Sequence, residues 1–553
     1  MKRLIVCLLL LAILAFALVS CGKKKPAATE EPTAATGTTD KWEALSPEVR
    51  AFPSDTRTLR IELSDFENAE KDSKNDLYVA GPDENALSGA DTIGKMVYER
   101  NSNAKRLLGT TVEYSYWDYA WESQGPKIVE VVQGADPSMP DLFVNMIYDL
   151  GNATLQGVLK DVWSIPGSYF DFEADGWMDE WMKSMSLTGD RAYILAGDYF
   201  IDIVRAFGVL PFNADLMDAN GAKLAPALLG GGLGAGETMS QRFFDYVEAG
   251  NWTWDALGKL CAAIWVDKGT AGQTDIYDTL GMLGNAQTGM TTSFYLYSAN
   301  EPLFETRTIK DENDPNNGKT WIYYAEDSTV LGGIFDAVAN VFKGDGALAT
   351  NASADNGATA ENPSTAYHWV KFGQGETLFA GACAMGAIEL DAFQEMRDLF
   401  SVVPLPKVSA DKKYNTIIHN IGDAGAINVK SEPGKTKVLS AYLQYCTEHS
   451  TAIRTHFQEV VVKYKNTVYN QGTDRMLDLI YNSVVNGRDK SIEDLMRGDA
   501  TCKGLQWHNF MKKEGKLDHT SAYIASDYKG ARDTKQAYLD SILETWYNLP
   551  TSK

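Results

Sequence analysis

The sequence predicts an α/β protein with two large lobes, and three observations support this prediction. Patterns typical of short strands alternate with patterns typical of amphipathic helices, as in parallel sheets covered by helices. Hydrophobic residues make up 44% of the chain and aromatic residues 11%, which is ample for a packed core. The chain has 553 residues, more than one core usually supports, so we expect two lobes.

The first part of the chain is expected to alternate three strands with two helices. Strands are short and rich in β-branched or aromatic residues, whereas helices repeat apolar residues every three or four positions. In chain order these patterns predict a strand at 57–63, a helix at 91–108, a strand at 110–117, a helix at 125–135 and a strand at 141–146.

The second part continues this alternation with one interruption. Apolar segments at 191–197 and 207–223 precede a helix that begins after Trp252. The region 301–365 is richer in Asp, Asn and Gly than its neighbours, and we interpret much of it as an insertion. Further strands are expected at 376–388 and 400–406, and further helices at 435–450, 474–487 and 534–549.

Residues 1–20 are expected to be a lipoprotein signal peptide. Lys2 and Arg3 precede an apolar run that is too short to span a bilayer. The run ends in LVSC, the lipobox pattern, so Cys21 is expected to carry a diacylglycerol and to begin the mature chain. An ordinary signal peptide cut elsewhere is the alternative. Residues 21–55 are expected to form a lipid-anchored disordered tether, whose first lysines attract anionic headgroups.

Composition excludes some partners and ligands. With 74 acidic and 51 basic residues the net charge is −23, so nucleic acid is not an expected partner. Four cysteines beyond Cys21 are interpreted as buried thiols, with disulfides as the alternative. No Cys/His spacing resembles a zinc site. The run DENDPNNG at 311–318 favours a surface turn over a calcium loop, because Pro315 breaks the EF-hand pattern. We therefore expect no metal and no cofactor.

The segment GNWTWDALGKL at 250–260 raises the question whether its tryptophans bind a ligand or build the fold. If Thr253 caps the helix, Trp252 and Leu257 have the spacing of a hydrophobic staple. Trp254 then begins the apolar stripe of the helix. Both tryptophans are therefore expected to be structural.

Four segments, taken in order, resemble the family 1 extracellular solute-binding proteins, which are the capture components of ABC importers. The resemblance implies a type II periplasmic-binding-protein-like fold, with two α/β lobes joined by a hinge around an inter-lobe cleft. The segments are IVEVVQGADPSMPDLF at 128–143, VLPFNADLMDANG at 209–221, GNWTWDALGKL at 250–260, and ETLFAGACAMGAIELDAF with FSVVPLPK at 376–393 and 400–407.

The resemblance also implies how the chain is divided. One lobe is expected to comprise 56–165 and 403–455, and the other 190–402 and 456–553. The segment SVVPLPK at 401–407 is expected to cross between them, because its prolines cannot extend a central strand.

Ligand contacts are expected beyond the carboxyl ends of the strands, where loops turn side chains into the crevice. In a sugar site, aromatic faces cover the apolar face of the ring, while carboxylates and amides bind its hydroxyls. The three aromatics near 117–121 fit a cleft and a core equally well, and a solvated strand edge is the alternative for Glu389. The candidates are Asp65, Phe66, Trp117, Tyr119, Trp121, Asn145, Tyr148, Asp198, Tyr199, Tyr295, Tyr297, Glu389, Asp391, Asn420 and Asp423.

The expected function is therefore that of a lipid-anchored receptor on the outer face of the cytoplasmic membrane. It would capture a solute, with an oligosaccharide as the expected class, and deliver it as a monomer to the permease subunits of an ABC importer. No catalytic residues are expected. A lipid-anchored glycoside hydrolase and a surface adhesion or scaffold protein are the alternatives.

Overall fold

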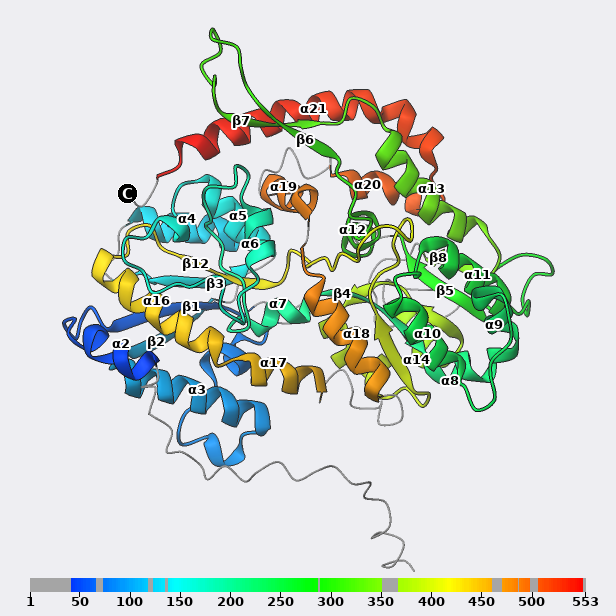
Figure 1. Ribbon diagram of the computed structural model, residues 1–553, viewed down its shortest axis with the longest axis horizontal. Coiled ribbons are helices and arrows are strands. Elements are labelled where there is room, and N and C mark those ends of the chain that lie inside the picture. Colours follow the sequence, from blue (N-terminus) through cyan, green and yellow to red (C-terminus); the bar gives the residue numbers. More distant parts are fainter. Residues whose placement is uncertain are drawn as a thin grey trace, which may run out of the picture. The chain divides into compact units, whose positions relative to one another are not determined.

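The computed structural model describes residues 41–65, 73–117, 123–134, 138–286, 289–350, 367–459, 470–485, 487–497 and 506–550. Residues 46–553 form one compact unit, and residues 1–45 form a separate one. The larger unit contains two separate sheets with helices around them and a two-stranded ribbon (Figure 1). The predicted α/β class is confirmed, and two sheets agree with two lobes.

Helix α2 (Lys41–Arg50) corrects the predicted tether. Residues 41–50 were expected to be disordered together with the preceding segment. The apolar residues Trp42, Leu45 and Val49 recur with helical spacing, and Val49 is fully buried. The tether prediction is therefore wrong for these residues, while residues 21–40 lie outside the described part of the chain.

The first sheet brings the ends of three strands and the start of a fourth to the same edge. Its order is β12-β3-β1-β2. β1 pairs in parallel with β2 and β3, so that Ser64 lies opposite Trp117, whereas β12 is antiparallel and its first residue, Asp423, lies opposite Met146. The strands are β1 (Thr58–Ser64), β2 (Thr111–Trp117), β3 (Leu142–Met146) and β12 (Asp423–Ile427).

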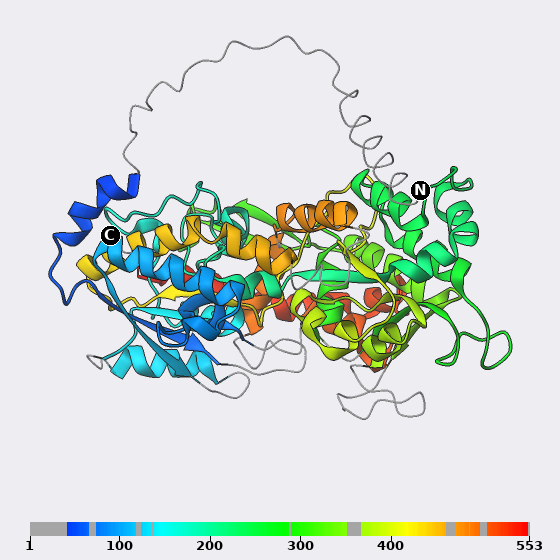
Figure 2. The same ribbon diagram turned by 90° about the horizontal axis from the view of Figure 1, so that it is seen from below.

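Helices cover both faces of this sheet. α3 (Thr92–Leu108) and α16 (Pro433–Glu448) pack side by side on one face, and α4 (Gln124–Gly134) lies on the other, against α5 (Ile147–Leu155) (Figure 2). The Asp91 side chain caps α3 by accepting a hydrogen bond of 2.7 Å from the Gly94 amide. Gly109 ends the helix with a φ of 66°, a left-handed conformation that favours glycine. The predicted first half is confirmed element by element.

The second sheet has the order β10-β4-β9-β5-β8, and β11 pairs with β4. The helices that follow in the sequence pack around it, with α11 against β5, α9 and α13. Its strands are β4 (Gly208–Asn213), β5 (Leu280–Asn285), β8 (Ala347–Thr350), β9 (Thr377–Ala380), β10 (Cys383–Ala384) and β11 (Phe400–Val403). The nearby helices are α8 (Ala214–Ala219), α9 (Gly221–Leu229), α10 (Met239–Glu248), α11 (Trp254–Ile264), α12 (Gly289–Tyr297), α13 (Thr329–Lys343), α14 (Tyr367–Gly373) and α15 (Asp391–Gln394).

Trp252 and Trp254 are both structural, as predicted. The Thr253 hydroxyl caps α11 by accepting a hydrogen bond from the Ala256 amide. Both indole rings are fully buried; Trp252 stacks on Phe379 and donates through Nε1 to the Pro404 carbonyl at 3.0 Å. Cys261, Cys383 and Cys446 are also buried, while Cys502 lies outside the described residues.

The region 301–365 was interpreted as an insertion, and this is only partly right. α13 packs on α11, and β8 is a strand of the second sheet, so both belong to the core. Among the described residues of this region, the antiparallel ribbon of β6 (Phe304–Thr308) and β7 (Thr320–Tyr324) forms a sheet of its own. Its connecting run at 311–318 forms surface turns, in which Asp311 and Asp314 accept hydrogen bonds from nearby amides. The segment 191–197, expected to be regular, contributes only isolated bridges such as Leu195 to Gly425.

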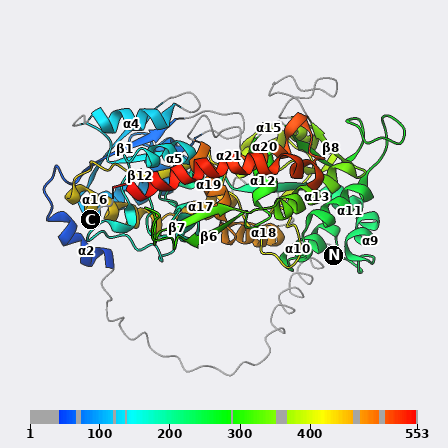
Figure 3. The same cartoon turned by 90° about the horizontal axis from the view of Figure 1, so that it is seen from above.

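The long C-terminal helix α21 (Ser521–Asn548) contacts elements around both sheets (Figures 1 and 3). At its start the Ser521 amide donates to Asp336 of α13, and at its end Trp546 packs on Tyr193. With a rise of 1.5 Å per residue it spans roughly 42 Å. No described helix is both long and apolar enough to cross a membrane. The other helices are α6 (Asp179–Met185), α7 (Ile201–Arg205), α17 (Thr451–Phe457), α18 (Asn470–Asn482), α19 (Gly487–Arg497) and α20 (Trp507–Met511).

Candidate functional site

A group of buried polar side chains gathers where the strands of the first sheet end. Glu62 and Ser64 come from the last residues of β1, Asn145 from β3, Asp423 from the start of β12, and Asn75 from the segment before the short helix η1 (Asp76–Ala80). All five are at most 2% exposed. We call these five residues the strand-end cluster. Their meeting follows from the register, since the antiparallel β12 brings Asp423 to the edge where β1 and β3 end.

The hydrogen bonds of Asp423 hold the cluster together. Its Oδ2 accepts hydrogen bonds from Ser73 Oγ at 2.6 Å and from Asn75 Nδ2 at 2.8 Å. The Asn75 amide group also donates to the Ser64 carbonyl at 3.0 Å. The segment after β1 is thereby tied to a strand that lies almost 350 positions later in the sequence.

Several polar atoms of the cluster lack a hydrogen-bond partner although they are buried. They include the Ser64 hydroxyl and Oδ1 of Asn75, whereas the Glu62 carboxyl has the Asn145 side chain as a partner. Buried polar groups in proteins are nearly always hydrogen-bonded, because an unmade bond costs about 1–3 kcal/mol. A concentration of such atoms at one edge of a sheet indicates a place where a polar ligand can supply the missing partners.

The acid at the centre of this cluster holds its proton strongly. Burial raises the pKa of Glu62 well above its usual value; the Asn145 side chain acts against this shift and the nearby Asp423 adds to it. A protonated carboxyl can donate one hydrogen bond and accept others. Glu62 can therefore bind a hydroxyl group in either direction.

A network of charges connects this edge to elements of the second sheet. Helix α7 contacts β12 and η1 on one side, and on the other the 3-10 helix η4 (Met385–Glu389) that follows β10. Arg205 of α7 binds Asp202 at 2.6 Å and Glu389 through two hydrogen bonds of 2.7 and 3.1 Å. The Asp423 amide donates to the other oxygen of Asp202 at 3.3 Å. Burial and the charge of Glu389 together raise the pKa of Tyr78 in η1.

This arrangement can bind and orient a polar molecule, because it offers donors and acceptors on residues from both sides of α7. Nothing in it resembles an activated nucleophile, and among the residues that the structure describes no three His, Cys, Asp or Glu side chains are placed to hold a metal ion. Its chemistry is that of recognition by hydrogen bonds.

Five of the predicted contact residues lie in or beside this network. Asn145 and Asp423 belong to the strand-end cluster, and Glu389 to the Arg205 network. Tyr148 is buried against Met146 and Ile421, and its amide donates to the Asn420 carbonyl at 3.3 Å. The rule that ligands gather at the carboxyl ends of strands thus selected residues that lie near one another, and their contact with a ligand stays a prediction.

Other predicted residues lie at the rim or outside the described part of the chain. Asp65 is exposed, and its amide donates to the Trp117 carbonyl at 3.0 Å, so both lie at the same edge of the sheet. Trp117 is half-buried against Phe143. Asp391 is exposed at the start of α15. Phe66, Tyr119, Trp121 and the proposed lipidation site Cys21 lie outside the described residues.

Four further candidates are placed elsewhere. Asp198 is fully buried, where its carboxylate accepts hydrogen bonds from Arg454 at 3.0 Å and from the Tyr481 hydroxyl at 2.7 Å. Tyr199 packs under the guanidinium of Arg100, in the layer between the sheet and its helices. Tyr295 is buried against Trp254, and Tyr297 lines a separate pocket. The structure does not bring these four into the strand-end cluster.

The sequence-based selection missed several residues of the network, among them Glu62, Asn75, Asp202 and Arg205. Three of them left a signal. Glu62 is an acid inside a strand whose last four residues are all buried, and Asp202 and Arg205 are charged residues in a fully buried helical turn. Charged residues are almost never fully buried without a partner or a function. Asn75 left no such signal, because it lies in a polar stretch.

No protein-family model matches the chain, and no curated protein sequence matches it. Solved structures do resemble its fold. The maltose/maltodextrin-binding domain MalE from Bdellovibrio bacteriovorus, bound to maltotriose, is 10% identical with a TM-score of 0.44, covering 86% of this chain and 99% of that one. A family 1 extracellular solute-binding protein from Bifidobacterium longum subsp. infantis is 14% identical with a TM-score of 0.45, covering 87% and 99%.

UgpB from Mycobacterium tuberculosis, in complex with glycerophosphocholine, is 13% identical with a TM-score of 0.45, covering 81% of this chain and 95% of that one. At such low identities and TM-scores, the likenesses by themselves say nothing about what this chain binds.

Proposed function

We propose that this protein is a solute-binding receptor of an ABC importer and that its solute is an oligosaccharide. The observation that carries the proposal is the set of buried, partnerless polar atoms in the strand-end cluster. The set includes a hydroxyl and an amide oxygen, and sugar hydroxyls can pair with both kinds. The Glu62 carboxyl and the Asn145 amide group beside them offer further donors and acceptors. Trp117 at the same edge provides an aromatic face for a sugar ring.

Binding is proposed to couple to closure of the two lobes, one at 56–165 and 403–455 and the other at 190–402 and 456–553. Helix α7 lies between the first sheet and η4, so a ligand held by the strand-end cluster sits next to the Arg205 network. A ligand that contacts both sides favours the closed form by its higher affinity for that form. The closed form would then be the one that the permease recognises.

The proposal includes attachment to the membrane. In it Cys21 carries the lipid, the chain is a monomer on the outer face of the cytoplasmic membrane, and the ABC permease subunits are its partners. It needs no catalytic residue, cofactor or metal. The short apolar run at 4–18 that ends in LVSC supports this part of the proposal.

The first experiment is a thermal-shift screen of the purified full chain. The panel contains maltotriose, acarbose, cycloalternan and monosaccharides, with glycerophosphocholine, short peptides and polyamines for comparison. A ligand that binds only the folded state raises the melting temperature. A shift with one sugar series supports the proposal, and a shift only with another solute keeps the receptor and rejects the carbohydrate. No shift at all favours the scaffold alternative, and release of cleaved sugar favours the hydrolase.

A pair of matched variants tests the site itself. Ser64→Ala removes a buried hydroxyl that has no partner in the protein. Thr110→Val removes another such hydroxyl at the opposite end of the same sheet. If the strand-end cluster binds the sugar, Ser64→Ala weakens binding by about two- to tenfold, and Thr110→Val leaves it unchanged. Equal affinities in both variants would place the sugar site elsewhere.

A further inference from the structure

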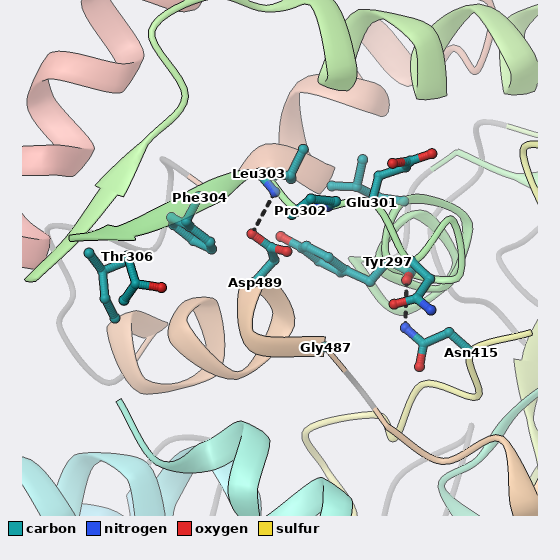
Figure 4. A pocket seen from close by; sticks show the side chains of 12 residues that line it. Tyr297, Glu301, Pro302, Leu303, Phe304, Thr306, Asn415, Gly487 and Asp489 are labelled. Carbon is teal, nitrogen blue, oxygen red and sulfur yellow. Dashed lines mark hydrogen bonds between the residues drawn. The ribbon is translucent and has the colours of Figure 1, made fainter. Parts of the chain in front are cut away.

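A second pocket lies beneath the start of the β6–β7 ribbon, at a distinct place from the strand-end cluster. Its volume is about 300 Å³, and it is enclosed by the end of α12, the residues leading into β6, and the beginning of α19 (Figure 4). The ribbon is the separate two-stranded sheet described above. The residues that shape the pocket most directly are Tyr297, Leu303, Phe304, Ile322, Asn415 and Asp489.

Two hydrogen bonds fix the walls of this pocket. The Leu303 amide donates to Oδ1 of Asp489 at 2.9 Å and so attaches the ribbon to α19. Nδ2 of Asn415 donates to the Tyr297 carbonyl at 3.0 Å. Figure 4 shows the Tyr297 ring directed from α12 toward Asp489. Asp489 and Asn415 are thus oriented by backbone groups on opposite sides of the cavity.

One polar atom of the walls is buried without a hydrogen-bond partner. It is Oδ1 of Asn415, a residue that is 4% exposed, whereas the Tyr297 hydroxyl has the carboxyl of Glu493 as its partner. Nδ2 of Asn415 already donates to the Tyr297 carbonyl, so the atom of this amide that remains without a partner is the acceptor Oδ1. A ligand with a hydrogen-bond donor would satisfy it.

The lining is acidic, and it becomes negatively charged when Asp489 ionises. Two carboxylates, Glu301 and Asp489, face the pocket, and none of its lining residues is basic. Lys412 pairs with Glu301 at 2.9 Å and leaves Asp489 without a cation of its own at the pocket wall. Apolar side chains, including Leu296, Leu303 and Phe304, make up much of the remaining wall.

We propose that this pocket binds a small organic ammonium compound, whose charged group lies between Asp489 and Asn415 and whose apolar body packs on Phe304 and Leu303. An ammonium group has only donors to offer, which matches the acceptors in the wall. The proposal goes beyond the capture of a sugar, and it gives the ribbon a role as the roof of a second binding site.

The ionisation of Asp489 supports this match. Burial raises the pKa of Asp489 to about 8; the Leu303 amide opposes the shift, Glu493 on the same helix adds to it, and Lys535 of α21 opposes it. The other charged groups near this end of α19 are the Glu301–Lys412 pair and His508 beside Glu493. A bound ammonium favours the charged carboxylate. Binding should therefore tighten between pH 7 and pH 8.5 and should release a proton at pH 7.

The test is calorimetry of the full chain with benzylamine, and with benzyl alcohol as the neutral probe of equal shape. At pH 8.5 benzylamine is expected to bind at least about tenfold more tightly than the alcohol, because a charged hydrogen bond is the stronger one. Asp489→Asn should remove this preference. Glu312→Gln, which changes an exposed carboxylate of the same ribbon, should leave it unchanged.

If Asp489→Asn does not fold, a second variant of the pocket provides the test. Phe304→Ala removes a partly exposed ring from the pocket wall, so the chain should still fold while losing about tenfold in affinity for benzylamine. Ser64→Ala should have no effect, which separates this site from the proposed sugar site. Absence of heat with benzylamine, equal affinity for the alcohol, or full binding by Asp489→Asn would overturn the proposal.

Discussion

Arg205 holds Glu389 with two parallel hydrogen bonds of 2.7 and 3.1 Å, and with its third nitrogen it holds Asp202 at 2.6 Å. The guanidinium is almost completely buried, whereas Glu389 keeps about a quarter of its side chain exposed. Asp202 in turn accepts a hydrogen bond from the Asp423 amide. The pair is therefore the point at which the edge of the first sheet and η4 are joined.

Removing the positive charge of Arg205 should strongly destabilise the folded protein. Arg205→Gln is expected to lower the free energy of unfolding by about 3–5 kcal/mol, because Asp202 would remain buried and charged without a partner. Urea denaturation measures the change. Arg307→Gln, which breaks an exposed pair with Glu305, is the control and should stay within about 1 kcal/mol. Similar losses in both variants would contradict the structural role of Arg205.

The buried acid Glu62 should make stability depend on pH. Its pKa is raised in the folded protein, while in the unfolded chain it is about 4.3. The folded state therefore binds the proton more tightly, and stability present below about pH 4 is lost as the pH rises toward the folded pKa. In Glu62→Gln the side chain does not ionise, so this part of the stability is not lost as the pH rises. Its free energy of unfolding, relative to the natural protein, should increase from pH 4 to pH 8.

Urea denaturation at several pH values checks the Glu62 prediction. The control is Glu113→Gln, which changes an acid of the neighbouring strand that is 56% exposed. That variant should show the same pH profile as the natural protein. A difference that stays constant from pH 4 to pH 8 would mean that the pKa of Glu62 is the same in the folded and the unfolded state.

The cap of α11 can be tested against a helix of similar length without such a cap. Thr253→Ala removes a side chain that accepts from the Ala256 amide, and it should cost about 1 kcal/mol of stability. Ser328 precedes α13, but its hydroxyl makes no cap hydrogen bond. Ser328→Ala should therefore change the stability by only a few tenths of a kcal/mol. Equal costs would show that the hydrogen bond of Thr253 contributes nothing.

Local sequence signals predicted much of the fold. The cap of α11 at Thr253 and the strands that end near Ser64 and Met146 depend on a few neighbouring residues, and the sequence shows them directly. The prediction failed for α13 and β8, where nearby polar runs obscured elements that pack into the core. Composition averaged over 301–365 could not separate the ribbon from these elements.

The candidate site was harder to predict, because long-range contacts create it. Asn75 and Asp423 meet across 348 positions, and no local pattern pairs them. The strand-end rule found Asn145 and Asp423, yet it also selected Asp198. That carboxylate follows an apolar segment too, but it turns toward Arg454. Only the positions of the surrounding helices distinguish these cases.

Trp546 attaches the end of α21 to the elements around the first sheet. Its ring packs on Tyr193 at 5.2 Å, and its Nε1 donates to the Thr188 hydroxyl at 2.9 Å. Trp546→Ala removes both contacts and should cost about 3–5 kcal/mol where the helix end is attached. The other end is held separately, through the Ser521 amide and Asp336. Hydrogen exchange should therefore become faster in the last turns of α21 and stay slow near Ser521.

Trp546→Phe separates the two contributions of this side chain. It keeps an aromatic ring against Tyr193 and loses the hydrogen bond to Thr188, so it should cost only about 1 kcal/mol. If the proposed closure is correct, release of this helix end in Trp546→Ala should also weaken solute binding, because α21 then no longer connects elements around the two sheets. Faster exchange along the whole helix would instead mean that α21 unfolds as one unit, and the helix could not act as a link with independently attached ends.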